Sequence, residues 1–99
     1  MKFGLKAKDW AILQAILVEP LKKKGINVLV FGSRARGDHR PFSDIDILLN
    51  TEIPLALSEI SQLKEKFEES SLPVKVDIVE LRDLAPSYKE SALKEAVPV

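Results

Sequence analysis

The sequence has 99 residues, in which fifteen lysines and arginines balance fifteen aspartates and glutamates, and it contains no cysteine. This length predicts one small domain spanning residues 1–99, and the zero net charge argues against a processive polymerase or a general RNA-binding protein, because no positive field would gather a polynucleotide. The lack of cysteine excludes disulfides and thiolate metal sites, and the lack of a signal peptide or an apolar run of about 20 residues favours a soluble cytoplasmic protein.

The first expected element is an amphipathic helix. It follows Asp9, the expected N-cap, and its apolar residues recur at helical spacing up to Gly25. These residues are Trp10, Leu13, Ile16, Leu17 and Leu21. Pro20 should kink or split the helix near Glu19, because proline lacks a backbone donor and disfavours helical geometry in the residue before it. The lysines at 22–24 fall in the last turn, where they complement the helix dipole, and we interpret them as solvated.

Two strands should follow, one on each side of a glycine turn. Val28–Phe31 is a continuous apolar run, as expected of a strand covered on both faces, and it leads directly into Gly32. The second strand, Asp44–Leu49, alternates in character, so that one face is core and the other is available for chemistry. Its core face carries Ile45, Ile47 and Leu49, and its other face carries Asp44, Asp46 and Leu48.

A helix and a third strand should complete the sheet. The segment from about Leu55 to Ser70 has an apolar stripe at helical spacing and ends before Pro73. The stripe consists of Leu57, Ile60, Leu63 and Phe67. The third strand, Val74–Val79, alternates as the second does, with Asp77 on the face that points away from the core. The connection is long enough for a right-handed parallel crossover, which would bring the three aspartates together.

A last helix is expected after Pro86, and Val97 and Val99 close the chain. The inward residues of this helix should be Tyr88, Ala92 and Leu93. The polar residues outside the site that we expect to be solvated are His39, Glu80 and Asp83.

Two carboxylates and a glycine turn form the most informative pattern. Asp44 and Asp46 alternate on a strand, so their side chains point the same way, about 7 Å apart. Facing carboxylates repel, and protonation of one or a hard divalent cation between them would relieve the repulsion. The turn at Gly32-Ser33 favours the cation, because glycine allows close backbone approach and the amides that start a short helix bind phosphate.

Each part of this pattern has an ordinary explanation when it stands alone. Gly32-Ser33 could be a strand-ending turn, and Asp44 with Asp46 could be a helix cap or a structural cation site. Asp77 is harder to explain in this way, because aspartate is depleted in strands and costly when buried unpaired. The sequence lacks the Gly-x-x-x-x-Gly-Lys-Ser/Thr motif of P-loop NTPases and is too short for the donor-binding domain of a metal-dependent glycosyltransferase.

The combined pattern resembles the minimal nucleotidyltransferases of the DNA polymerase β-like superfamily. Their signature is Gly-Ser, about ten residues, Asp-x-Asp and a third carboxylate on a later strand. Here it consists of Gly32-Ser33, residues 34–43, Asp44-Ile45-Asp46 and Asp77, with the flanking Arg36-Gly37 and Ser43 that are common in this group. The resemblance covers nearly the whole chain. It implies an α/β (α+β) fold, a small mixed β-sheet packed by helices in the order α-β-(short α)-β-α-β-α.

The resemblance also implies a reaction and its cofactors. A nucleoside monophosphate, by our interpretation AMP from ATP, would pass to an acceptor hydroxyl with the help of two Mg²⁺ or Mn²⁺ ions. Asp44 and Asp46 would hold the metal that carries the triphosphate and share a second metal with Asp77. Asp77 would be either only a ligand or also the base that accepts the hydroxyl proton.

Phosphate contacts are assigned by the same resemblance. Gly32 and Ser33 would meet the β- and γ-phosphates at the start of a short helix. Arg36 would neutralise the leaving pyrophosphate, with Arg34 and Arg40 as further candidates.

The acceptor half of the reaction is expected on another chain. Larger relatives carry a second domain that covers the base and presents the acceptor, and this chain is too short to include one. The resemblance therefore implies a helical HEPN-type partner or substrate-binding subunit, and a role as the antitoxin of a toxin–antitoxin pair whose toxin receives AMP. Two alternatives remain, namely a small-molecule acceptor and a module that binds and neutralises a helical partner without catalysis.

Overall fold

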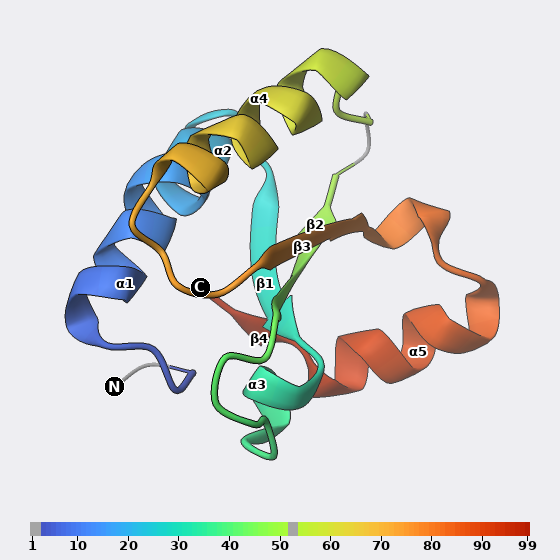
Figure 1. The fold of residues 1–99 in the computed structure, drawn as a ribbon. Helices are drawn as coiled ribbons and strands as arrows, with labels where there is room; N and C mark the ends of the chain where they lie inside the picture. Colours follow the sequence, from blue (N-terminus) through green and yellow to red (C-terminus); the bar gives the residue numbers. More distant parts are fainter. Residues whose placement is uncertain (1–2, 52–53) are drawn as a thin grey trace.

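The computed structural model describes residues 3–51 and 54–99 and contains a four-stranded mixed sheet (Figure 1). The strands are β1 (Asn27–Phe31), β2 (Ile45–Asn50), β3 (Val76–Glu80) and β4 (Val97–Pro98), in the spatial order β3-β2-β1-β4. Strand β1 is antiparallel to both of its neighbours, whereas β2 and β3 are parallel. The predicted fold class and parallel crossover are confirmed, and β4 is an addition to the predicted order.

Helices cover the sheet on two sides. They are α1 (Ala7–Leu13), α2 (Glu19–Lys23), α3 (Ser33–Arg36), α4 (Leu57–Glu69) and α5 (Pro86–Glu95), with a π-helical segment η1 (Gln14–Val18) before α2 and a 3-10 turn η2 (Leu81–Asp83) after β3. Figure 1 shows α1, α2 and α4 on one side of the sheet and α5 on the other. Within the described residues, the helices are too short or too polar to cross a membrane.

The N-terminal helical run differs from the prediction in its start and in its hydrogen bonding. It begins at Ala7 with Lys6 as the N-cap, so Asp9 does not cap it but lies inside the first turn, only 4 % exposed. Backbone dihedrals stay helical through η1, and α2 begins at Glu19. Pro20 therefore lies in the first turn of α2, where the missing N–H costs little. The helical run does not break at Pro20, and its hydrogen-bonding pattern changes from π-helical in η1 to α-helical in α2.

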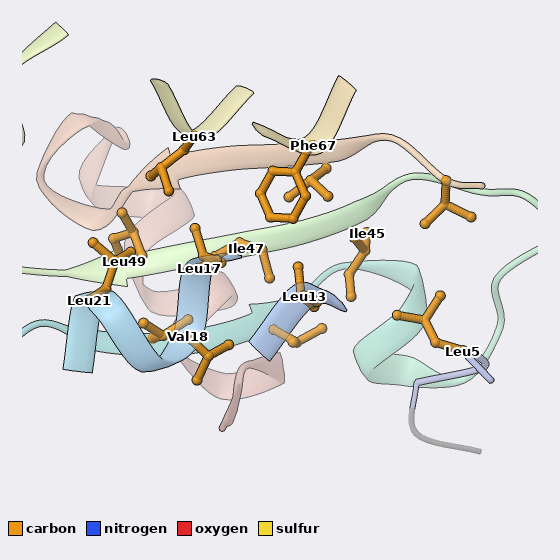
Figure 2. Close-up of a cluster of buried hydrophobic side chains, with 14 of the residues drawn as sticks. Leu5, Leu13, Leu17, Val18, Leu21, Ile45, Ile47, Leu49, Leu63 and Phe67 are labelled. Atoms are coloured by element: carbon orange, nitrogen blue, oxygen red, sulfur yellow. The ribbon is translucent and has the colours of Figure 1, made fainter. Parts of the chain in front are cut away.

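The core lies between the first helical run, α4 and one face of the sheet (Figure 2). The predicted inward face of β2 is confirmed, since Ile45, Ile47 and Leu49 are fully buried. In β1 only Val28 and Val30 are buried, and Leu29 and Phe31 on the opposite face are half-buried, so the prediction of full cover on both faces holds for one face only. The core thus fixes which side chains of β2 are left for the other face.

Several apolar residues that were expected inside are exposed. Leu57 is 83 % exposed because it is the first residue of α4 and its side chain tilts toward the helix N-terminus, beyond the turns that pack through Leu63 and Phe67. On α5 only Ala92 is buried, whereas Tyr88 and Leu93 are 68 % and 47 % exposed. The small side chain of Ala92 is therefore the buried one on α5, and the larger side chains of Tyr88 and Leu93 lie in solvent.

Two polar residues that were expected in solvent are covered. Glu80 is buried because its Oε1 accepts a hydrogen bond from the Leu55 backbone N–H at 2.8 Å, which holds the connection before α4. His39 is half-buried because its ring lies against Gly4, where a Cβ would overlap the imidazole. Asp83 is exposed, as predicted.

Candidate active site

The turn after β1 approaches the second strand too closely for any side chain at Gly32. This residue has φ 75° and ψ −155°, a conformation that is nearly confined to glycine. In the β1–β2 register Phe31 lies opposite Asp46, so the chain passes beside the Asp46 carboxylate as it turns. A Cβ at Gly32 would overlap the Asp46 carboxylate oxygen Oδ2. The predicted turn is confirmed, and it packs directly against a predicted site aspartate.

Helix α3 begins immediately after this turn. Gly32 is its N-cap and has no side chain that could cap the helix, and the first helical hydrogen bond runs from the Arg36 N–H to the Gly32 carbonyl at 3.1 Å. The first amides of a helix have no intrahelical acceptor. Ser33, the first residue of α3, is half-buried beside them. This geometry suits an anion, as expected for the Gly32-Ser33 pair.

Two of the three predicted aspartates lie side by side in the sheet, whereas Asp44, predicted as the first residue of the second strand, lies just before β2, where strand pairing has not yet begun. Asp46 and Asp77 are register partners on the parallel strands β2 and β3, and Asp44 lies two residues before Asp46. Asp46 is half-buried, while Asp44 and Asp77 are exposed. Burial raises the pKa of Asp46, and the charges of Asp77 and Asp44 raise it further, against an opposing effect of Arg36. The carboxylates therefore interact through space.

This donor set matches a hard divalent cation in chemistry. All of its donors are carboxylate oxygens, which Mg²⁺ and Mn²⁺ prefer, and their mutual repulsion is the cost that a bound cation would remove. Among residues 3–51 and 54–99, no three acidic or histidine side chains already surround one point. Asp46 and Asp77 lie on adjacent strands and Asp44 just before β2, and these three carboxylates do not form a preassembled cage.

The arginines of the connecting segment have different roles. Arg34 is 4 % exposed and donates from Nη1 to the Phe3 carbonyl at 2.8 Å and from Nε and Nη2 to the Ser43 carbonyl at 3.1 and 2.8 Å. It thus fastens the loop before β2 to the N-terminal segment, and its burial leaves it no route to a phosphate. Arg40 is exposed, and its backbone N–H donates to Ser43 Oγ at 2.9 Å.

Arg36 is exposed on the other side of α3 and lies within electrostatic range of Asp46. Its guanidinium donates to two carboxylates, Asp38 and Glu95, and these bonds raise its pKa. Neither carboxylate was predicted as part of the site. Asp38 could have been suspected from its position two residues after Arg36, whereas Glu95 is 59 residues away in sequence and is brought near only by the fold.

Arg34→Lys should lower stability by about 2 kcal/mol, because the compact ammonium lacks the planar fork of donors that spans the part-buried Phe3 and Ser43 carbonyls and leaves an acceptor unsatisfied. For a domain of this size that loss corresponds to a fall of about 10 °C in the melting temperature, measured by circular dichroism. Arg40→Lys, an exposed change in the same segment, should leave the melting temperature unchanged. Equal melting temperatures for Arg34→Lys and wild type would contradict the fastening role of Arg34.

Comparison with known proteins agrees with the geometry of the turn and the aspartates. The sequence profile described as "Nucleotidyltransferase domain" matches residues 13–99. The chain belongs to this nucleotidyltransferase family. The resemblance inferred from the Gly-Ser and Asp-x-Asp motifs is therefore confirmed at the level of the family.

This nucleotidyltransferase is similar in sequence to assigned proteins and in fold to solved structures. It is 32 % identical to a protein of Haemophilus influenzae assigned as the protein adenylyltransferase MntA, over 99 % of this chain and 84 % of the relative. A solved structure assigned as a minimal nucleotidyltransferase is 38 % identical, with a TM-score of 0.68, and the match covers 100 % of this chain and 97 % of the other. The similarity thus extends over nearly the full length of both chains.

A third comparison concerns the fold alone. The structure of a toxin–antitoxin solved with AMP-PNP contains a chain that is 22 % identical, with a TM-score of 0.66, over 86 % of this chain and 70 % of that one. The same nucleotidyltransferase architecture therefore occurs in a two-protein assembly that was crystallised with an ATP analogue.

Proposed function

We propose that this nucleotidyltransferase transfers AMP from ATP to a hydroxyl group of a protein partner. The observation that carries the proposal is the register of the sheet, which places the Gly32 turn against Asp46 and Asp46 beside Asp77. A turn suited to phosphate and a set of carboxylates suited to a cation thereby share one face of the sheet. The relative assigned as a protein adenylyltransferase supports AMP as the transferred group and a protein as the acceptor.

In this reaction one bond to the α-phosphorus forms and another breaks. The acceptor oxygen attacks this atom, the bond to the bridging oxygen of pyrophosphate breaks, and pyrophosphate leaves with the electron pair. The hydroxyl proton passes to a base, for which Asp77 is our candidate. Mg²⁺ or Mn²⁺, two ions in our proposal, would be held by Asp44, Asp46 and Asp77 and would neutralise charge on the phosphates.

Binding of the triphosphate falls to the turn and to α3. The amides after Gly32, with Ser33, would donate to the β- and γ-phosphates, because no side chain at the N-cap competes for them. Arg36, the exposed last residue of α3, would face the leaving pyrophosphate. We also propose that residues 1–99 form a single minimal nucleotidyltransferase domain, and the match to a solved minimal nucleotidyltransferase over 100 % of this chain supports this.

The acceptor is proposed to be a helical HEPN-type toxin, with this chain as its antitoxin in the cytoplasm. The fold match to a toxin–antitoxin chain is consistent with such a pairing. The resemblance of the sequence to two-component minimal nucleotidyltransferases supplies the HEPN partner.

Transfer of label from ATP to the partner tests the proposal. The purified chain is mixed with Mg²⁺ and the protein encoded by the neighbouring gene, once with ATP labelled at the α-phosphorus and once at the γ-phosphorus. We expect label on the partner only from α-labelled ATP, and none with Asp44→Asn/Asp46→Asn. Label from the γ-position would mean phosphorylation and would overturn the proposal. A toxin that is neutralised equally well by the double variant would support the non-catalytic alternative instead.

A further inference from the structure

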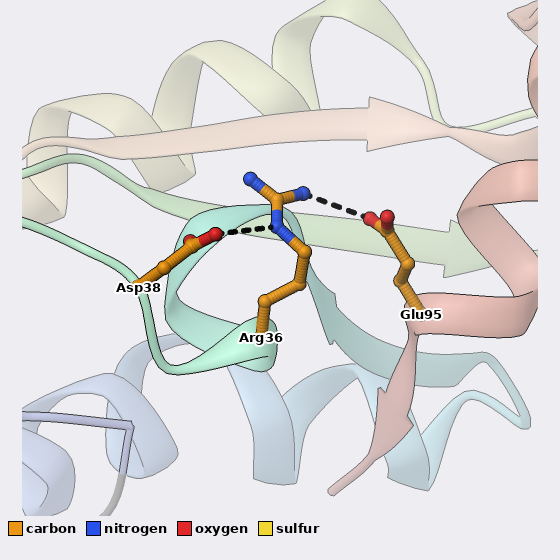
Figure 3. Close-up of polar contacts among 3 residues, drawn as sticks. All are labelled: Arg36, Asp38 and Glu95. Atoms are coloured by element: carbon orange, nitrogen blue, oxygen red, sulfur yellow. Dashed lines mark hydrogen bonds and ion pairs between the residues drawn. The ribbon is translucent and has the colours of Figure 1, made fainter.

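The Arg36 guanidinium is held from two directions (Figure 3). Nε donates to Asp38 Oδ2 at 3.1 Å, and Nη1 donates to Glu95 Oε2 at 3.0 Å. Asp38 lies two residues after the end of α3, whereas Glu95 is the last residue of α5. Two segments that are far apart in sequence thus fix one exposed arginine.

The backbone on both sides of the Arg36–Glu95 contact is anchored to the same strand. Strand β4, two residues after Glu95, pairs with β1 through Val97 and Val30, and the Val99 N–H donates to the Val28 carbonyl at 3.1 Å. On the other side of the contact, Arg36 belongs to α3, which follows β1 directly through Gly32. Exposed ion pairs are weak when two mobile side chains must be ordered, but here the two elements are already placed.

Arg36 lies close to the predicted metal ligands and yet does not bind them. Its positive charge is near enough to act on Asp46. Among the ion pairs of the described residues, those of Arg36 run to Asp38 and Glu95, and none joins it to any of the three aspartates. An arginine near a group of carboxylates is attracted to them, and the attraction rises as the distance falls.

We propose that Glu95 is a positioning residue that holds Arg36 beside the metal-binding carboxylates and prevents the guanidinium from closing onto them. This inference rests on the proposed function, which makes Asp44, Asp46 and Asp77 the metal ligands. The Nη2 atom donates to neither Asp38 nor Glu95, so it remains available for a phosphate oxygen. Glu95 thereby keeps the guanidinium on the phosphate side of the site and the carboxylate oxygens open to the cation.

Loss of Glu95 should turn Arg36 into a competitor of the metal. A guanidinium that is released at Nη1 can rotate toward Asp46 and occupy the carboxylate lone pairs that the cation needs. Mn²⁺ affinity should therefore fall in Glu95→Gln and should not fall in a protein that lacks the arginine. Arg36→Gln alone should bind Mn²⁺ more tightly than wild type, because a positive charge next to the site is removed.

The test is a double-mutant cycle on Mn²⁺ binding, read from the electron paramagnetic resonance signal of free Mn²⁺ without nucleotide. We expect Glu95→Gln to raise the dissociation constant about fivefold, the effect of one ordered, partly exposed ion pair. In the Arg36→Gln background the same substitution should change the constant by less than about twofold. Glu90→Gln is the matched control, because Glu90 lies on the same helix and its 3.9 Å ion pair is with Lys94 and not with Arg36.

The outcomes separate three explanations. An equal loss of affinity in both backgrounds would mean that Glu95 acts through its own charge, and this would overturn the positioning role. An unchanged constant in Glu95→Gln would overturn it too. A wild-type protein that binds no Mn²⁺ would instead contradict the metal site on which the proposed function depends, and the inference would fall with it. A structural loss alone would lower the melting temperature of Glu95→Gln without changing the Mn²⁺ constant.

Discussion

Asp46→Asn is expected to lower the rate of AMP transfer by about three orders of magnitude, because a metal that neutralises phosphate charge contributes several kcal/mol to the transition state and the variant loses the central ligand. Asp46 is the aspartate next to both the Gly32 turn and Asp77. The other two aspartates are exposed, and neither is the register partner of Phe31 at the Gly32 turn, so neither takes the place of Asp46.

The same substitution should make the metal-free protein more stable. Partial burial, and then the charges of Asp77 and Asp44, raise the pKa of Asp46, so folding favours its neutral form. Ionised Asp46 therefore destabilises the fold above its pKa, and this penalty disappears as the pH falls through the raised pKa to the value of the unfolded chain. At pH 7 in EDTA the melting temperature of Asp46→Asn should exceed that of wild type, and below about pH 4 the difference should vanish.

The combination of lower activity and higher stability distinguishes a site residue from a structural one. Scanning calorimetry in EDTA and the α-labelled ATP assay measure the two quantities on the same preparations. Asp83→Asn, which changes an exposed aspartate in η2, should alter neither. If Asp46→Asn were less stable than wild type in EDTA, its inactivity would be explained by damage to the fold, and the metal-site interpretation would lose its support.

Local periodicity was sufficient for the elements that place the aspartates. The alternation in Asp44–Leu49 correctly assigns Ile45, Ile47 and Leu49 to the core face of β2 and Asp46 to the other, because a strand has a fixed period of two. The prediction does not hold at Asp44, which lies before β2, or at Leu48, which is fully buried on the face of Asp46. The Gly32 turn was also predictable, since few residues other than glycine can adopt its conformation. Together with the length of the crossover, these signals predict the relation between Asp46 and Asp77 that the register confirms.

Features that depend on how a helix is oriented in the fold could not be predicted from the sequence. Arg34 and Arg36 are two residues apart on α3, so they point about 200° apart around the helix axis. Which of them faces the interior depends on how α3 packs, and the sequence carries no local mark of this. In the fold, Arg34 is buried on backbone carbonyls and Arg36 is exposed near the carboxylates.

Contacts between residues far apart in the sequence could not be predicted either. Strand β4 has only two residues, too few for a period, and its pairing with β1 is what brings Glu95 to Arg36. The error at Asp9 has a similar origin, because the helix start is fixed one turn earlier, where Leu5 is buried in the core. A good N-cap residue does not identify the cap when tertiary packing selects the first turn.

Gly32→Ala should damage both the fold and the site, although it adds only one methyl group. Its φ and ψ lie in a region that costs a non-glycine residue about 1–3 kcal/mol, and the new Cβ would overlap the Asp46 carboxylate. Either the Asp46 carboxylate must rotate or the turn must move away, and both change the geometry between the turn and Asp46. We therefore expect the melting temperature to fall by more than about 10 °C and AMP transfer to be lost even at temperatures where the variant remains folded.

Gly37→Ala separates the two causes of this damage. Gly37 also has a positive φ, 84°, but a Cβ there meets no atom within 4 Å, so the substitution should cost only the left-handed backbone, about 1 kcal/mol, and should retain activity. In an Asp46→Ala background the overlap at Gly32 is largely removed, and Gly32→Ala should then destabilise by less than it does in the wild type. Thermal unfolding of the four variants measures this difference. Equal losses in both backgrounds would show that backbone strain alone is responsible, and that the turn does not depend on its approach to Asp46.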